Sequence, residues 1–488
     1  MAKFKKYFII KRDTMVNFKI YTRAVILNKE RNKVLLIKKN NKQKIASNNW
    51  LLPGGTLEFN EEVELSLIRE IKEETNLNII DLQLITSKKI LVEKTHWLGL
   101  YFLVNVANEA DLMNAEKDKH EFVKFVPLND IPDLKDYAVL QFIKGIDSNK
   151  EFFTTPVNDK KHAMGEALSK YIENKVHGFL KTNVELFSRI KIIGNYDRST
   201  HVSKHEKNDK LFNFKRPTAF IDGDILYISC FPGKDYIYHY AKLIRTYLHI
   251  NEIEKEVSYL QPSQATIEYA FKKTNIENIP NADVIIYGNV DKIGLWEDKD
   301  FVGEGDFLWK SGKINGKRVL LLGCKFSIWG DAGFDFIKIL AKSNNFSTFV
   351  YIGKLGTLSE NVSPNTFIAT GAESFVNEKT IHWRNIFSNI DDNSVIYGKH
   401  VTYPSVLDET KEEIKLLKNE YDFIDPEIGN MALACDELGK QFSYLHIISD
   451  NVVNHNKLEN LSNERKSLIL NKRTKLFKDI GKIIETNL

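Results

Sequence analysis

The sequence has little cysteine and no long apolar stretch, and each shortage excludes a class of protein. Its three cysteines, Cys230, Cys324 and Cys435, are far apart and form no CxxC pair. We therefore expect three buried thiols, with neither a disulfide framework nor a zinc site. No apolar run approaches the roughly 18 residues of a membrane span. The N-terminal segment is charged and lacks the apolar core of a secretory signal, so we expect a cytoplasmic protein with no membrane partner.

The sequence also has no large excess of positive or negative charge. The 69 basic and 65 acidic residues give a net charge of +4, which argues against nucleic acid as the partner. Hydrophobic residues make up 43% and charged residues 27%, as in a globular protein. Only 12 of the basic residues are arginine. Each arginine is a candidate for a specific role, because lysine does not replace its bidentate fork.

The 488 residues predict two to four domains, at roughly 100–200 residues per domain. Residues 1–150 mix short strands with an amphipathic helix over 61–75 and a closing helix expected over 131–146. Residues 281–488 alternate strands and helices, which predicts an α/β domain with a mixed sheet covered on both faces.

The stretch between them, 151–280, matches no pattern that we recognise and is left as an unassigned α+β region. A helix is expected over 163–180, and a hairpin around Asp222-Gly223. The polar stretch 195–216 is interpreted as a solvated loop, with a phosphate-contacting loop as the alternative.

The helix of the first region presents two faces. We expect Asn60 to cap its N-terminus. Val63, Leu67 and Ile71 recur every four residues and form the face packed on the sheet.

Three carboxylates lie on another face of this helix. Glu70, Glu73 and Glu74 are spaced i, i+3 and i+4, which places them within about 6 Å of one another. Such a cluster repels itself unless a cation lies in it, and its hard oxygens suit Mg²⁺ or Mn²⁺. A solvated acidic helix face is the alternative.

The order of the residues around these carboxylates resembles the Nudix hydrolase box. The matching positions are Gly55-x5-Glu61-x7-Arg69-Glu70-Ile71-x-Glu73-Glu74, preceded by Trp50-Leu-Leu-Pro-Gly. The resemblance implies a Nudix α/β/α sandwich with a mixed sheet that cleaves nucleoside diphosphate derivatives. It makes Glu70, Glu73 and Glu74 the ligands of Mg²⁺ or Mn²⁺, with one of them a candidate base. Gly55, Glu61 and Arg69 would support the box, the last two as an ion pair.

One position departs from this box, where Asn76 replaces the glycine after the paired glutamates. We expect the helix to end there in the left-handed conformation, which asparagine tolerates next best.

Polar residues follow three strands of the last region. Strand 421–424 leads to Glu427, strand 442–448 to Asp450, and strand 346–352 to a turn expected over Gly353–Gly356. Because ligands bind at the carboxyl ends of strands in such sheets, these side chains predict one pocket. Helix caps and an ordinary turn are the alternative for each.

Together they resemble the purine nucleoside phosphorylase and nucleosidase superfamily, over about residues 281–488. The similarity is carried by GKRVLLLGCKFSIWGDAGFDFIKIL, YIGKLGTLSENVSPNTFIATGA and DPEIGNMALA followed by FSYLHIISDN. It implies that Glu427 binds the ribose hydroxyls and that Asp450 protonates or binds the purine at N7. Arg465 would support that aspartate, and Gly353, Lys354 and Gly356 would contact the substrate.

The phosphate-binding positions of the phosphorylases differ in this sequence. Tyr351 and Lys354 stand where an Arg and a Ser bind the attacking phosphate, Lys292 replaces another Arg, and Pro426 replaces a methionine. Bidentate phosphate recognition is weakened, so hydrolytic base release, or a substrate with its own phosphates, is favoured over phosphorolysis. An inactive nucleotide-binding domain is the alternative.

The two resemblances together predict a fused nucleotide-degrading enzyme whose substrates are small nucleotides or nucleosides. Destruction of a nucleotide pool in antiviral defence is a hypothesis from this pairing. A nucleotide-sensing regulator is the alternative. Phosphorylase-like folds often build their pocket across subunits, so we expect a homo-oligomer.

Overall fold

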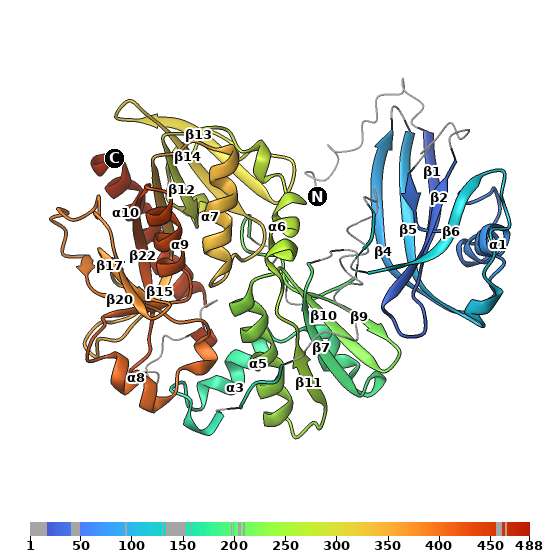
Figure 1. The fold of residues 1–488 in the computed structure, drawn as a ribbon. Coiled ribbons are helices and arrows are strands. Elements are labelled where there is room, and N and C mark those ends of the chain that lie inside the picture. The colour runs from blue at the N-terminus through green and yellow to red at the C-terminus, as the bar shows by residue number, and fades with distance from the viewer. Residues whose placement is uncertain are drawn as a thin grey trace, which may run out of the picture. The chain divides into compact units, whose positions relative to one another are not determined.

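A computed structural model of the chain describes most of its residues. The described residues are 17–40, 49–92, 95–128, 130–132, 153–157, 159–196, 198, 200–203, 206–207, 210–454, 461–463 and 466–488. The closing helix expected over 131–146 lies almost wholly outside them. The chain folds into two units, one of Met1–Lys150 with Asp197–Thr200 and the other of Glu151–Tyr196 with His201–Leu488 (Figure 1).

The described residues of the first unit form two small sheets and one α-helix. One sheet has the order β1-β5-β4 and the other the order β3-β2-β6. The strands are β1 (Asn17–Ile26), β2 (Lys33–Lys39), β3 (Trp50–Leu51), β4 (Ile79–Val92), β5 (Thr95–Val106) and β6 (His120–Pro127), and the helix is α1 (Val63–Thr75). Leu67 and Ile71 of α1 are buried with Ala24, Leu35 and Phe102 of the strands, as their spacing predicted.

The two ends of α1 test the helix predictions. Asn76 ends the helix in the left-handed conformation, with φ 61°, and its N–H bonds to the carbonyl of Lys72, so this prediction is confirmed. The prediction of Asn60 as N-cap was wrong. Asn60 itself has a φ of 63°, which turns the chain, and the helix begins after Glu62.

The first part of the second unit is a five-stranded sheet of order β11-β7-β10-β9-β8. Its strands are β7 (Arg189–Gly194), β8 (His201–Val202), β9 (Thr218–Asp222), β10 (Ile225–Cys230) and β11 (Glu256–Tyr259); the helices are α3 (Ala167–Lys175), α4 (Gly178–Thr182), α5 (Lys234–Ile250) and α6 (Gln264–Lys272). The hairpin at Asp222-Gly223 is confirmed, with Gly223 at φ 59°. The single helix expected over 163–180 is two helices, because the chain is extended at Val176 and His177 caps α4.

A larger sheet of 11 described strands fills the rest of this unit. Its strands are β12 (Val284–Gly288), β13 (Phe307–Ile314), β14 (Lys317–Cys324), β15 (Thr348–Thr357), β16 (Ile368–Thr370), β17 (Glu373–Val376), β18 (Lys379–His382), β19 (Val395–Tyr397), β20 (His400–Thr402), β21 (Phe423–Asp425) and β22 (Gln441–Asn451); its helices are α7 (Ala332–Ser343), α8 (Lys411–Leu417), α9 (Ile428–Glu437) and α10 (Ser467–Asn487). Strands β14, β12, β15 and β22 run parallel side by side, and β13 pairs antiparallel at the edge.

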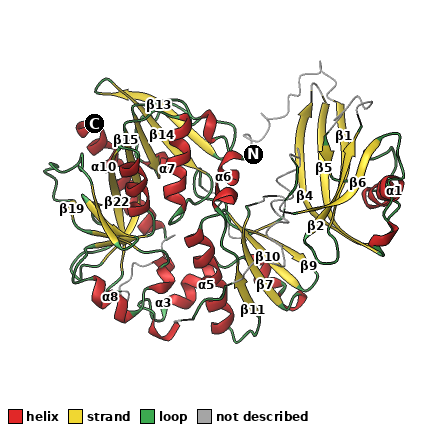
Figure 2. Cartoon of the chain, viewed as in Figure 1, coloured by secondary structure: helices red, strands yellow, loops and turns green. Residues whose placement is uncertain are grey.

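Figure 2 shows helices packed beside the strands of this sheet. Alternate residues of a strand point to opposite faces of the sheet. Ile285 and Phe349 pack in one core with α7 and α9, whereas Ile286 and Val350 pack in another with α10. The prediction of a mixed sheet covered on both faces is confirmed, and with it the α/β fold class.

One prediction about this sheet was wrong. Gly353–Gly356 is not a turn, because β15 continues to Thr357 beside β22, which itself continues to Asn451. A bulge after Leu355 brings Gly356 opposite Asp450. Lys354 and Asp450, which we placed after their strands, therefore lie within them, whereas Glu427 follows β21 at the start of α9, as expected.

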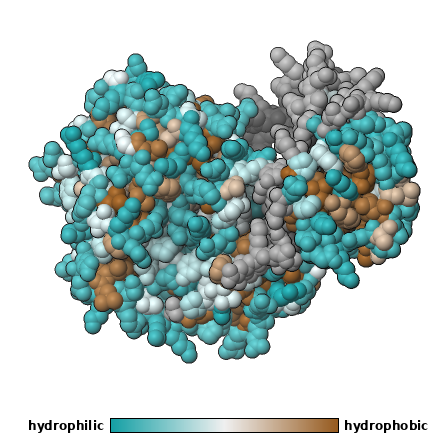
Figure 3. All heavy atoms as spheres, in the orientation of Figure 1, coloured by the Kyte–Doolittle hydropathy of each residue, from teal (hydrophilic) through white to brown (hydrophobic). Residues whose placement is uncertain are grey.

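The burial of the cysteines and the character of the surface agree with what the composition predicted. The three cysteines are free and buried, as predicted. On the face shown in Figure 3, hydrophilic side chains cover most of the surface, and apolar side chains show only in separate patches. None of the helices in the described ranges is long and apolar enough to span a membrane.

Candidate active sites

The loop before α1 brings its backbone against two of the box glutamates. The N–H of Gly54 donates to Oε2 of Glu74 at 2.7 Å, and its carbonyl accepts from Arg23. A Cβ on Gly55 would lie 2.0 Å from the carboxyl carbon of Glu70. Glycine at position 55 is therefore required if the Glu70 carboxylate is to sit against this loop.

Arg69 lies among three carboxylates. Its Nε and one terminal nitrogen donate to the two oxygens of Glu61 at 2.8 and 3.1 Å. Its other terminal nitrogen lies 3.0 Å from Glu70 and 3.2 Å from Glu73. The hydrogen bonds from Arg69 to Glu61, with one from the N–H of Glu58, lower the pKa of Glu61 to about 2. Arg69 thus ties the loop to the helix and supplies positive charge beside two box glutamates.

Glu74 is the buried member of the box and faces a different part of the chain. Burial raises its pKa to about 7. Nε2 of His120 lies 3.5 Å from its Oε1, and Glu116 completes a group whose potential ligand atoms lie within 4.8 Å of one another.

A divalent cation fits this group. Burial lowers the pKa of His120, which leaves a neutral imidazole able to ligate, and its Nδ1 has no hydrogen-bond partner among the described residues. Carboxylate oxygens with one imidazole suit Mg²⁺ less than Mn²⁺. Glu116 and His120 were missed in the sequence analysis, because they lie more than 40 residues after Glu74 and no local motif marks them.

The second unit contains a cavity of about 280 Å³ at the carboxyl ends of its parallel strands. The sequence-predicted residues that line it are Gly353, Lys354, Gly356, Glu427 and Asp450. Lys292 is not among the lining residues, and its ammonium lies 5.8 Å from the centre of the Phe477 ring. Arg465 lies outside the described residues.

Carboxylates form the buried part of this cavity. Asp450 is 4% exposed and accepts a hydrogen bond of 2.6 Å from the Ser449 hydroxyl. Burial raises the pKa of Glu427 well above its usual range, helped by the neighbouring Asp425. Asp425 in turn accepts the N–H groups of Glu427 and Ile428, which holds the start of α9 at the cavity.

Two buried histidines stand behind Asp425. Nε2 of His400 lies 3.1 Å and Nε2 of His446 3.8 Å from its oxygens. Burial alone would raise the pKa of Asp425, but the nearby His400 and His446 rings hold that pKa below its usual range. Burial lowers the pKa of His446 to about 4. A Cβ on Gly353 would lie 2.6 Å from the His446 ring, so this glycine leaves room for it.

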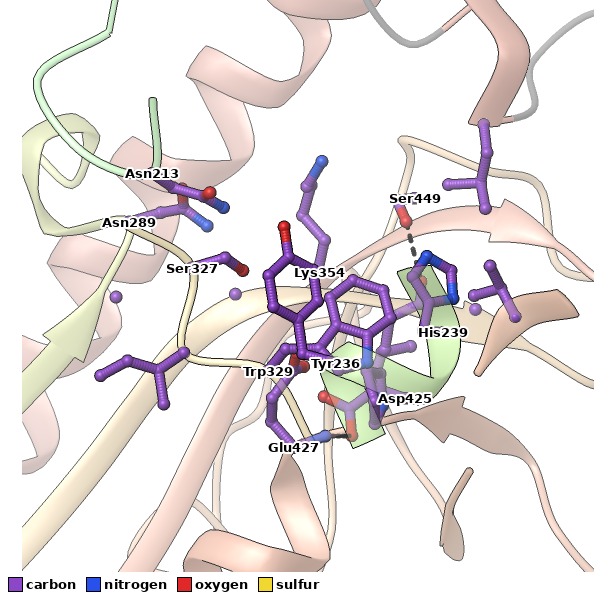
Figure 4. Close-up of a pocket in the computed structure, with 18 of the residues that line it drawn as sticks. Asn213, Tyr236, His239, Asn289, Ser327, Trp329, Lys354, Asp425, Glu427 and Ser449 are labelled. Carbon is purple, nitrogen blue, oxygen red and sulfur yellow. Dashed lines mark hydrogen bonds between the residues drawn. The ribbon is translucent and has the colours of Figure 1, made fainter. Parts of the chain in front are cut away.

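An aromatic wall of the cavity was missed from the sequence. His239 stacks on Trp329 with ring centres 4.6 Å apart, and Tyr236 lies 5.9 Å from the same ring. Figure 4 shows these rings beside Lys354 and Glu427. Tyr236 and His239 come from α5, in the region that we left unassigned. Flat faces of this kind suit stacking with a nucleobase.

Two other charged residues near the cavity were also missed. Glu409 lines it at 3% exposure, and its Oε2 has no hydrogen-bond partner among the described residues. Burial raises the pKa of Glu409 well above its usual range, with a contribution from Asp450. Arg473 is buried and donates to Asn365 at 2.6 Å and to the carbonyl of Ser449 at 3.4 Å.

Comparison with known proteins identifies the first unit. Residues 19–143 match the NUDIX domain family. The chain is 32% identical to an ADP-ribose pyrophosphatase of Methanocaldococcus jannaschii over 133 residues, which are 26% of this chain and 75% of that protein. The chain belongs to the NUDIX family. Its prediction as a Nudix-type hydrolase is thereby confirmed.

Solved structures are similar to each of the two ends. A MutT NUDIX hydrolase from Burkholderia pseudomallei is 26% identical, covers 25% of this chain and 92% of its own, and has a TM-score of 0.23. A 5′-methylthioadenosine/S-adenosyl homocysteine nucleosidase of Helicobacter pylori is 15% identical, covers 42% of this chain and 95% of its own, and has a TM-score of 0.32.

Proposed function

We propose that the NUDIX unit hydrolyses the phosphoanhydride of a nucleoside diphosphate derivative with Mg²⁺ or Mn²⁺. The observation that carries this proposal is the buried Glu74, with a pKa of about 7, beside Glu116 and His120. Glu70, Glu73 and Glu74, with Glu116 and His120, would hold the cation, which when bound polarises a phosphoryl oxygen. Water attacks phosphorus, the P–O–P bond breaks, and a box carboxylate takes the proton of the water.

We propose that the second unit removes the base from a purine nucleoside or nucleotide by hydrolysis. The observation that carries it is Asp450, buried in a cavity with the Tyr236, His239 and Trp329 rings. Asp450 donates a proton to N7 while the bond between N9 and C1′ breaks and its electron pair moves to the base. Glu427 bonds the ribose hydroxyls, and water adds at C1′ and loses its proton to solvent.

Both proposals are tested by incubating the full chain with Mg²⁺ and a nucleotide panel that includes ADP-ribose. Products are separated by chromatography. Free base and cleaved phosphoanhydride are both expected. If neither product forms while nucleotides still bind, the chain is instead a nucleotide-sensing regulator.

Two degradative sites in one chain support the hypothesis that the protein depletes a cytoplasmic nucleotide pool in antiviral defence. Cells that express the wild type should resist phage better than cells that express Glu73→Gln with Asp450→Asn. Equal plaque counts would reject this role. We also propose a homo-oligomer, which light scattering during size-exclusion chromatography would test.

A further inference from the structure

Five cationic side chains line the cavity of the second unit, and base removal gives them no task. They are Lys175, Lys207, Lys210, Arg216 and Lys354. All five are half-buried, whereas the four lining carboxylates, Glu409, Asp425, Glu427 and Asp450, are buried. The carboxylates therefore occupy the inner part of the cavity and the cations its more exposed part.

The charge of the lining favours an anionic ligand. Five cations line the cavity with four carboxylates, and burial raises the pKa values of Glu409 and Glu427 well above the usual range, which favours their neutral forms and adds to the excess of positive charge. A nucleoside has no charge that would offset this excess. A phosphate group would, through charge-assisted hydrogen bonds.

The backbone holds part of this cationic side in place. The N–H of Asn213 donates to the carbonyl of Cys324 at 2.8 Å, and the N–H of Phe214 to the carbonyl of Lys325 at 2.9 Å. This attaches the stretch that carries Lys210 and Arg216 to the end of β14. Figure 4 shows neutral donors there too, with Asn213, Asn289 and Ser327 on one side of Lys354.

We propose that Lys210, Arg216 and Lys354 form a phosphate-binding subsite, so that the second unit acts on phosphorylated nucleosides. The proposal rests on the base-removing function and specifies its substrate class. The phosphate could also come from inorganic phosphate as the attacking group, which would release ribose 1-phosphate.

The test compares base release by the full chain from adenosine, adenosine with inorganic phosphate, and adenosine 5′-monophosphate. The monophosphate has no phosphoanhydride for the NUDIX unit to cleave. We expect kcat/KM at least about tenfold higher for the monophosphate, and Lys354→Ala or Arg216→Ala to remove most of that preference. Lys272→Ala is the matched control, because Lys272 is exposed on α6 away from the cavity.

Each outcome decides the subsite. Stimulation by inorganic phosphate that Lys354→Ala weakens would support the subsite with the other phosphate source. Equal use of all three substrates, unaffected by Lys354→Ala and Arg216→Ala, would overturn it. If no base is released, the proposed function fails, and the subsite is tested on its own by measuring ligand binding with titration calorimetry. Tighter binding of the monophosphate than of adenosine, lost in Lys354→Ala, supports the subsite, and equal binding rejects it.

Discussion

The two units surround their carboxylates with different groups. In the NUDIX unit, Glu70 and Glu73 are met by the permanently charged Arg69, and Glu74 faces the neutral His120. In the second unit, Asp425 lies beside His400, and burial raises the pKa values of Glu409 and Glu427 well above their usual range. The first arrangement gathers carboxylate oxygens and one imidazole that a cation could bind. The second keeps protons inside a cavity, as acid catalysis requires.

The largest expected effects separate the two sites. Asp450→Asn should lower base release by about 10²–10⁴-fold, because it removes the proton donor, and leave phosphoanhydride cleavage intact. Glu73→Gln should lower only phosphoanhydride cleavage, because it removes a ligand oxygen without disturbing the core; the Glu73 side chain is 50% exposed. Initial rates of both products measure this. If either substitution abolished both products, the two activities would have to share one site.

A smaller effect is expected from the glycine beside Glu70. Gly55→Ala should lower phosphoanhydride cleavage by about 10²-fold, because the added methyl displaces the carboxylate. Rates in Gly55→Ala, Glu70→Ala and the double variant measure the coupling. The substitutions should not be additive, since the methyl has nothing to displace once Glu70 is alanine. Additive losses would contradict this explanation.

Within the cavity, Glu409 and Asp450 should respond differently to the loss of charge. Glu409→Gln should change base release by less than about threefold, because burial raises the pKa of this carboxyl well above its usual range and so favours its neutral form. The rate is compared with that of Asp450→Asn in the same assay. If Glu409→Gln lowered the rate of base release as much as Asp450→Asn, Glu409 would be identified as a proton donor.

The last prediction concerns the stability of the second unit and not the rate of either reaction. His446 has a pKa of about 4 in the folded chain, below its usual 6.5, because it is buried. The contribution of the neutral His446 to the free energy of unfolding is therefore complete above pH 6.5. It is lost as the pH falls toward 4, by about 3 kcal/mol in all. Urea unfolding at several pH values should show a shallower loss in His446→Gln than in the wild type. Parallel curves would indicate an ordinary pKa.

The sequence predicted the NUDIX site better than the cavity. The box lies in one loop and one helix, so the i, i+3, i+4 spacing and the left-handed end at Asn76 could be deduced from local rules. The hairpin at Asp222-Gly223 followed in the same way from a local turn signal.

The cavity depends on contacts between distant segments. Tyr236 of α5 reaches Trp329 only through tertiary packing, and nothing in the local sequence announces it. The strands β15 and β22 run past the expected turn because each pairs with the other, a pairing that local glycine signals do not report. Glu116 and His120 meet Glu74 for the same kind of reason.

The central claim is that one chain carries a metal-dependent phosphoanhydride site and a separate base-removing site. The most direct test treats the full chain with excess EDTA and follows both products by chromatography. The account predicts that phosphoanhydride cleavage stops, while base release from adenosine 5′-monophosphate continues at an unchanged rate. Loss of both activities with the metal, or persistence of both without it, would contradict the account.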